Sequence, residues 1–277
     1  MKENAQPVKR NRTDYKKRVA PYKEQALEAL KELVAIPSVL DEKTKTEKMP
    51  FGKGVDRALA YVADLGKKLG FHVDRCDNYI TELTYGEGEK TLDVYAHCDV
   101  VPVKKENWHH NPFQLTIEEG NIMYGRGASD DKGPGLSCLF AVKALRDEGR
   151  LGGYKLRFLF GGNEENDSLG LKHYFHKLNK GYPTLGISPD ADYPLIYAEK
   201  SIYSYEEDLA VTIPDIEDFS LGSALNIVLA EASVTLKGHL DQVDELRAQY
   251  KARYPKVKIT RKGNTLFFLG HPYHGSR

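Results

Sequence analysis

Three apolar segments that stop at acidic or histidine side chains constrain the fold more than any other feature of the sequence. These segments have the composition of buried β-strands: Leu92–Ala96, Lys155–Phe160 and Leu185–Ser188. They are followed by His97, by Glu164-Glu165 and by Asp190, respectively. Because functional residues gather at the carboxyl ends of strands in α/β sheets, we expect these side chains to lie along one edge of a sheet.

Helical patterns separate these strands. Apolar residues recur at helical spacing in four segments: Asp14–Ala35, Val55–Leu69, Gly133–Gly149 and Leu169–Leu178. Phe71–Cys76 and Tyr79–Tyr85 have the pattern of two further strands, joined by a short turn at Asp77-Asn78. Strands that alternate with helices predict an α/β fold in which helices flank a sheet.

The pattern changes after about Ile213. A strand at Ser233–Lys237, a helix at Asp241–Arg253 and a hairpin made by Val257–Thr260 and Thr265–Leu269 follow one another. This order predicts the start of a small α+β domain.

Composition excludes several classes of function. Forty basic and forty acidic residues cancel, so no overall charge favours nucleic acid or an anionic membrane. No apolar run approaches the roughly 20 residues that span a bilayer, and the basic N-terminus lacks the apolar core of a secretory signal. The widely spaced Cys76, Cys98 and Cys138 favour a reducing cytoplasm over a disulfide framework. We therefore expect a cytoplasmic protein that binds neither nucleic acid nor membrane.

Two motifs carry candidate metal ligands in the first half of the chain. His97 and Asp99 are two residues apart, which places both on one side of a strand, although such a pair can also form without a metal. Asp130 lies in the glycine-rich segment Gly125–Gly133, which lacks the spacing of a phosphate-binding loop. It either binds cations or caps the helix that follows.

Two more motifs follow. The adjacent carboxylates of Glu164 and Glu165 end an apolar strand, where they are costly unless a positive group neutralises them. Because neighbouring side chains diverge, one can bind metal while the other faces substrate; the alternative is a solvated turn. Asp190 is a further candidate ligand or a turn residue, and the spacing around it excludes an EF-hand.

The four motifs together predict a site for two divalent metal ions that hydrolyses an amide bond. Two such ions carry four positive charges, which Asp130, Glu165, Asp190 and a hydroxide would balance. A semi-buried site tolerates this neutral arrangement far better than it tolerates bare carboxylates.

These residues resemble motifs of the dinuclear zinc exopeptidase family, which includes PepV-type dipeptidases, carboxypeptidase G, aminoacylase and succinyl-diaminopimelate desuccinylase. The matching motifs are His97-Cys98-Asp99, Gly125–Gly133, Asn163-Glu164-Glu165 and Ser188–Pro194. The last motif is most similar to the PepV-like dipeptidase branch. The resemblance covers roughly residues 20–277 and implies a zinc-exopeptidase-like sheet flanked by helices, followed by a small lid domain.

The resemblance also implies a set of metal ligands. His97 and Asp190 would hold one metal ion, Glu165 would hold the other, and Asp130 would bridge them. Zinc is the metal that the family implies, and nitrogen and oxygen ligands also accept manganese or cobalt.

The remaining roles are implied in the same way. Asp99 would orient His97, and Glu164 would be the general base that assists attack by a metal-activated hydroxide. In the lid, Asn226 and His274 resemble residues that contact the substrate.

In the family the chain returns from the lid to supply a last histidine ligand, and this sequence ends at Arg277. We therefore expect a truncated family member. The expected organisation is a frayed N-terminus (1–13), an incomplete catalytic metal-binding domain (14–212) and a partial lid domain (213–277).

The leading hypothesis is a metallopeptidase that cleaves dipeptides and whose partner is a small peptide substrate. Two alternatives stay open: an N-acyl-amino-acid or desuccinylase-type amidase, and a non-catalytic metal-binding remnant. The sequence leaves the oligomeric state open.

Overall fold

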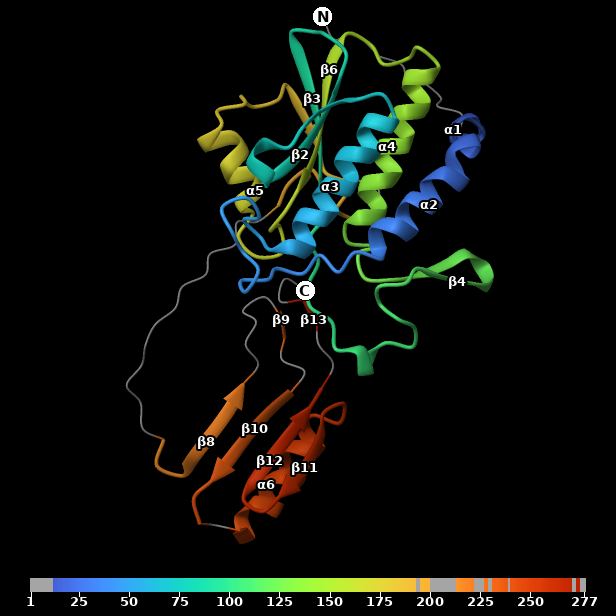
Figure 1. The fold of residues 1–277 in the computed structure, drawn as a ribbon. Helices are drawn as coiled ribbons and strands as arrows, with labels where there is room; N and C mark the ends of the chain where they lie inside the picture. The colour runs from blue at the N-terminus through green and yellow to red at the C-terminus, as the bar shows by residue number, and fades with distance from the viewer. Residues whose placement is uncertain are drawn as a thin grey trace, which may run out of the picture. The chain divides into compact units, whose positions relative to one another are not determined.

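The computed structural model describes residues 12–192, 195–199, 213–221, 227–228, 231–238, 240–270 and 273–274. The chain divides into two compact units, Met1–Glu199 and Lys200–Arg277 (Figure 1). The predicted domain boundary at residues 212–213 lies at the edge of a segment outside the described residues, and it stays a prediction. No helix in the described part of the chain combines the length and the apolar character needed to cross a bilayer.

The first unit is built on a five-stranded mixed sheet with the strand order β1-β2-β6-β3-β7. The strands are β1 (His72–Asp74), β2 (Ile80–Tyr85), β3 (Lys90–His97), β6 (Tyr154–Gly161) and β7 (Leu185–Ile187). Strand β3 runs parallel to both β6 and β7, whereas β2 is antiparallel to β6 and to β1. The carboxyl ends of β3, β6 and β7 therefore meet at one edge of the sheet.

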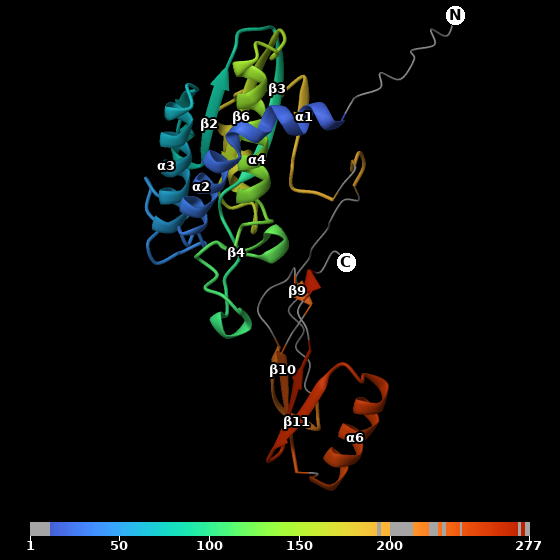
Figure 2. The same ribbon diagram turned by 90° about the vertical axis from the view of Figure 1, so that its right-hand side faces the viewer.

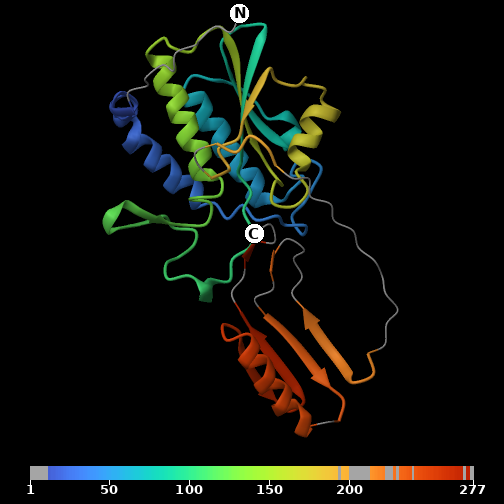
Figure 3. The ribbon, with the colours of Figure 1, turned by 180° about the vertical axis from the view of Figure 1, so that it is seen from behind.

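Helices cover both faces of this sheet. One face carries α2 (Lys23–Val34), α3 (Lys53–Lys68) and α4 (Lys132–Asp147), which lie side by side in Figures 1 and 2. The other face carries α5 (Leu169–Lys172) and the π-helical turn η5 (His173–Lys177), as seen from behind in Figure 3. This arrangement confirms the predicted α/β fold with flanking helices.

The two faces hold separate apolar cores, and β6 contributes to both. Its residues Leu156, Phe158 and Phe160 belong to the core under α2, α3 and α4, whereas Leu159 packs with Ile80 and Tyr174 on the other face. Successive side chains of a strand point to opposite faces, so a strand covered on both sides becomes an uninterrupted apolar run. In β6 the uninterrupted apolar part is Phe158-Leu159-Phe160, and it indicates a buried strand although Lys155 and Arg157 are charged.

Local geometry modified two of the predicted elements. The helix predicted at Asp14–Ala35 is divided into α1 (Arg12–Val19), the 3₁₀ turn η1 (Ala20–Tyr22) and α2. Pro21 lies in that turn, and proline lacks the N–H that a continuous helix needs. Between β1 and β2, the short 3₁₀ turn η2 (Cys76–Asn78) replaces a tight hairpin turn, and its three residues all have positive φ.

The segment between β3 and α4 consists of short elements. They are η3 (Lys105–Asn107), β4 (Thr116–Glu118), η4 (Glu119–Asn121) and β5 (Ile122–Tyr124). Strands β4 and β5 pair antiparallel with each other.

In the described residues of the second unit, a four-stranded antiparallel sheet is accompanied by one helix. The elements are β8 (Ile216–Leu221), β10 (Glu231–Leu236), α6 (Leu240–Arg253), β11 (Lys258–Lys262) and β12 (Thr265–Leu269), and the strand order is β11-β12-β10-β8. Ile259 and Leu266 are buried at its centre. The short strands β9 (Ile227–Val228) and β13 (Tyr273–His274) pair with each other. Strand β8 had not been predicted.

A buried ion pair crosses the first sheet on the face that carries η5. Asp93 and Arg157 are paired neighbours in β3 and β6, and Arg157 donates to both carboxylate oxygens of Asp93, at 2.7 and 2.8 Å. Arg157 also donates to the carbonyls of Lys180 and Gly181, at 2.7 and 2.9 Å. One guanidinium thus joins two strands to the loop that leads into β7.

We expect Arg157→Met to lower the free energy of unfolding by about 3–5 kcal/mol, because it leaves the Asp93 carboxylate buried without its cation. The double variant Arg157→Met/Asp93→Leu should recover part of this loss, since no bare charge remains. Denaturant titration of both variants measures the difference. A double variant no more stable than the single one would contradict this account of the pair.

Candidate metal centre

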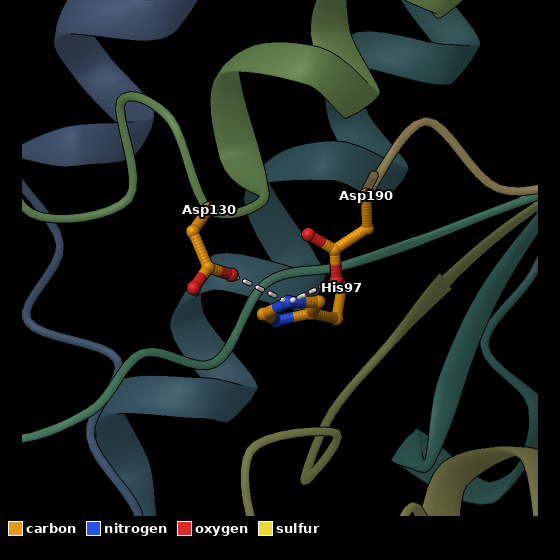
Figure 4. Close-up of side chains that lie close together, drawn as sticks. All are labelled: His97, Asp130 and Asp190. Atoms are coloured by element: carbon orange, nitrogen blue, oxygen red, sulfur yellow. Dashed lines mark hydrogen bonds and ion pairs between the residues drawn. The ribbon is translucent and has the colours of Figure 1, made fainter. Parts of the chain in front are cut away.

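His97 is the centre of the candidate site. It is the last residue of β3, and its side chain is fully buried. Its Nε2 lies 3.1 Å from Asp130 Oδ1 and 3.4 Å from Asp190 Oδ2 (Figure 4). One ligand atom from each of these three residues lies within 4.8 Å of the other two, which is close enough for all three to contact one ion.

The sheet topology explains how residues from distant parts of the chain meet here. His97 ends β3, and Glu164 and Asp190 follow the neighbouring strands β6 and β7. Asp130 comes from the turn that precedes α4, on the opposite side of His97 from Asp190 in Figure 4. These side chains come together because β3, β6 and β7 are parallel and their carboxyl ends lie at the same edge of the sheet.

Asp99 contacts both His97 and the Glu164-Glu165 segment. Its backbone carbonyl lies 3.0 Å from His97 Nδ1, and its carboxylate lies 3.5 Å from the same nitrogen. A hydrogen bond from Nδ1–H to this carbonyl would fix the tautomer whose Nε2 is available as a ligand. The two carboxylate oxygens of Asp99 accept the backbone N–H groups of Glu164 and Glu165, both at 3.1 Å.

The two glutamates do not occupy equivalent positions. Glu164 Oε2 lies 3.7 Å from His97 Nε2. Glu165, the predicted ligand of a second metal ion, is not part of the three-residue cluster found among the described residues. Its pKa is nevertheless raised to about 7, first by burial and then by the charge of Asp130. Its role as a ligand therefore stays a prediction.

Asp131 was not predicted as a site residue, yet it is completely buried beside His97. Its Oδ2 accepts the backbone N–H of His97 at 3.2 Å, and its Oδ1 has no hydrogen-bond partner among the described residues. Burial, followed by the charge of Asp190, raises the pKa of Asp131 to about 8. Asp130 and Asp131 are adjacent in the sequence, and nothing in their pattern indicates which of the two carboxylates is buried.

Lys132 was also missed. Its side chain is fully buried, and burial lowers the pKa of its ammonium group to about 8. Its Nζ donates to the backbone carbonyls of Leu33 and Ile36, at 3.0 and 2.8 Å. No pattern in the sequence indicates this contact, because Leu33 and Ile36 lie 99 and 96 residues before Lys132.

The structure bears on two simpler alternatives, namely that Asp130 caps α4 and that Asp190 is only a turn residue. The residue before α4 is Asp131, not Asp130, and within the described part of the chain no side-chain hydrogen bond caps this helix. Asp130 is therefore not the helix cap. Asp190 does lie in a local turn, where its N–H contacts Ser188 Oγ at 3.4 Å, but its carboxylate also reaches His97.

The predicted lid residues lie largely outside the described part of the chain. Asn226 is outside the described residues. The backbone of His274 belongs to β13, and its side chain is outside the description. Their predicted contacts with substrate stay predictions.

The electrostatics of the cluster test whether it suits a cation. Burial alone would lower the pKa of His97, but its contacts with Asp130, Asp190 and Asp99 raise it strongly. Burial and neighbouring carboxylates raise the pKa of Glu164 as well. Such crowding of like charges is relieved by a positive ion, and the imidazole and carboxylate donors are ligands of zinc, manganese and cobalt. The residues present therefore fit a divalent metal ion.

Comparison with known proteins adds an independent line of evidence. The model of a family described as "Peptidase family M20/M25/M40" matches residues 94–267. A "Beta-Ala-Xaa dipeptidase" of Lactobacillus delbrueckii subsp. lactis is 33% identical over 229 residues, which cover 81% of this chain and 48% of that protein. The chain spans about half the length of the curated relatives it matches, from 47% to 50%.

Two solved structures are also similar. The dipeptidase Dug1p from Saccharomyces cerevisiae superposes with a TM-score of 0.52 at 28% identity, covering 61% of this chain and 38% of that one. A metallo-carboxypeptidase, Sso-CP2 from Sulfolobus solfataricus, gives a TM-score of 0.51 at 30% identity, covering 60% of this chain and 37% of that one.

The acidic cluster predicts how stability depends on pH without metal. Asp131 and Glu165 have folded-state pKa values, about 8 and about 7, above their ordinary values of 3.8 and 4.5. Their protonated forms therefore stabilise the fold below the ordinary values, and this contribution is lost as the pH rises through the folded-state values. The raised pKa of His97 acts in the same direction above its ordinary value of 6.5.

We therefore expect the melting temperature of the metal-free protein to fall between about pH 5 and about pH 8. A divalent ion should remove most of this decline, because it supplies the missing positive charge at high pH. Thermal unfolding with a chelator and with added Zn²⁺, Mn²⁺ or Co²⁺ measures both effects. Higher stability at the upper pH without metal would contradict the prediction.

Proposed function

The chain belongs to peptidase family M20/M25/M40, and on this premise we propose that it acts as a metal-dependent dipeptidase. The observation that carries the proposal is the convergence of His97, Asp130 and Asp190 beside Glu164 at one sheet edge. A metal site next to a carboxylate of raised pKa is the combination that hydrolysis of an amide bond needs.

His97, Asp130 and Asp190 would hold one divalent ion, and Asp130 would share a second ion with Glu165. Zinc is the first candidate for both positions, followed by manganese and cobalt, because all three accept nitrogen and oxygen ligands. When bound, such ions polarise the scissile carbonyl and lower the pKa of the attacking water.

Glu164 would move the proton. Its carboxylate is near His97 Nε2 without being part of the three-residue cluster, so it can face a water rather than an ion. Burial raises its pKa, which suits a group that accepts a proton from water and then gives it to the leaving amine. Asp99 would assist by holding the backbone of Glu164 through the hydrogen bond to its N–H.

Dipeptides are the substrate class that the relatives favour, since the curated relative and the yeast structure are both named as dipeptidases. Asn226 and His274 of the second unit would contact the substrate. The three free cysteines support a reducing cytoplasm as the site of action.

The role of Glu164 is tested by Glu164→Gln. We expect kcat to fall by roughly 10²–10⁴-fold, because the variant removes the proton acceptor and keeps the shape of the side chain. Metal content, measured by elemental analysis, should stay at the wild-type value. The exposed Glu89→Gln is the matched control and should leave both quantities unchanged. Equal activity of Glu164→Gln and wild type would remove Glu164 from the mechanism.

The substrate class is tested with one dipeptide in two forms, unblocked and N-acetylated. A dipeptidase should show a higher kcat/KM for the unblocked form. Preference for the acetylated form would favour an N-acyl-amino-acid amidase. Metal bound without turnover of either form would favour a non-catalytic metal-binding protein.

A further inference from the structure

Lys132 connects the turn that carries Asp130 to the end of a different helix. It begins α4, and its ammonium group reaches the carbonyls of Leu33 and Ile36 at the carboxyl end of α2. Leu33 lies in the last turn of α2, whose carbonyls carry the negative end of the helix dipole, and Ile36 lies two residues beyond the helix. A buried cation is therefore held where the backbone offers it two oxygen acceptors.

The aliphatic part of the Lys132 side chain also fills the inside of this turn. A Cβ added at Gly127 would lie 2.8 Å from Lys132 Cδ and 3.2 Å from Val100 Cγ1. Gly127 has a φ of +89°, and its carbonyl accepts the N–H of Gly133 at 3.1 Å. The backbone from Gly127 to Gly133 therefore bends closely around the Lys132 side chain, and Asp130 belongs to this bend.

The same end of α2 also holds the strand that carries His97. Ser38 Oγ donates to the carbonyl of Cys98 at 2.6 Å, and the carbonyl of Ser38 accepts the N–H of Val100 at 3.0 Å. One short segment after α2 thus binds the residues that follow His97 through Ser38 and the Asp130 turn through Lys132. The turn and the strand are thus both tied to the end of α2, in addition to the direct hydrogen bond from His97 N–H to Asp131.

We propose that Lys132 is a positioning residue for the metal centre, which sets the place of the Asp130 carboxylate by binding the carboxyl end of α2. The inference rests on the metal site proposed above. Lys132 does not ligate the ion in this account; its loss would let the Asp130 turn shift and would loosen the geometry around the ion. Loss of a group that orients a metal ligand typically weakens metal binding by about 10–100-fold.

Arg146 offers a matched control at the other end of α4. Its guanidinium donates to the carbonyl of Leu69 at 2.5 Å, just after the carboxyl end of α3. It therefore makes the same kind of contact as Lys132, from a cation on α4 to a carbonyl at the end of a neighbouring helix. The two positions are fourteen residues apart in α4, which is roughly 21 Å along a helix axis.

The experiment compares Lys132→Met with Arg146→Met in the full chain, using Co²⁺ as the probe. Each variant is stripped of metal and titrated with Co²⁺, and the affinity, the visible absorption spectrum and the melting temperature of the metal-free form are recorded. We expect Lys132→Met to bind Co²⁺ about 10–100-fold more weakly than wild type, with a changed spectrum. Arg146→Met should lower the melting temperature and keep the wild-type affinity and spectrum.

The outcomes separate the two proposals. If both variants lose stability and both keep the wild-type Co²⁺ affinity and spectrum, Lys132 has only a structural role and the inference is wrong. If wild type itself binds no Co²⁺, the metal site and the inference both fail. Should Lys132→Met not fold, Lys132→Gln, which keeps a neutral donor on a similar side chain, makes the same comparison with the same deciding readouts.

Discussion

The crowding of carboxylates around one buried imidazole is the constraint on which the rest of the first unit depends. Asp130, Asp190 and Glu164 all lie within 4 Å of His97 Nε2. Mutual repulsion and lost hydration would drive such groups apart or protonate them unless a cation lies among them. The surrounding structure must therefore hold negative side chains in place against their own repulsion. Two buried residues that the sequence patterns do not indicate contribute to this: Asp131, which accepts the backbone N–H of His97, and Lys132, which binds the end of α2.

Asp99 shows how the fold achieves this with a single residue. Its backbone carbonyl lies next to His97 Nδ1, whereas Nε2 faces Asp130 and Asp190, and its carboxylate binds two successive N–H groups after β6. The segment that carries Glu164 and Glu165 follows β6 directly, and Asp99 also binds it to the segment just after β3. The predicted role of Asp99, orienting His97, accounts for only the first of these three contacts.

The sequence could predict those parts of the site that follow from strand periodicity. His97, Glu164 and Asp190 end or follow apolar segments, and the parallel arrangement of β3, β6 and β7 brings such ends together. Contacts that depend on tertiary structure could not be predicted in this way. Asp131 and Lys132 have the sequence appearance of a helix start, and only the tertiary structure reveals that both are buried, Asp131 against His97 of β3 and Lys132 against the end of α2.

The position of Lys132 also resolves an apparent conflict in the sequence. A lysine two residues from Asp130 could neutralise the very carboxylates that a metal ion needs. The structure directs its ammonium group to Leu33 and Ile36 instead, and two carbonyl acceptors satisfy it there. At the same time α4 begins beside the carboxylates, so that its positive dipole end stabilises them without competing as a ligand. The chain thus places a fixed cation next to its acidic cluster and still leaves the carboxylates available to an ion.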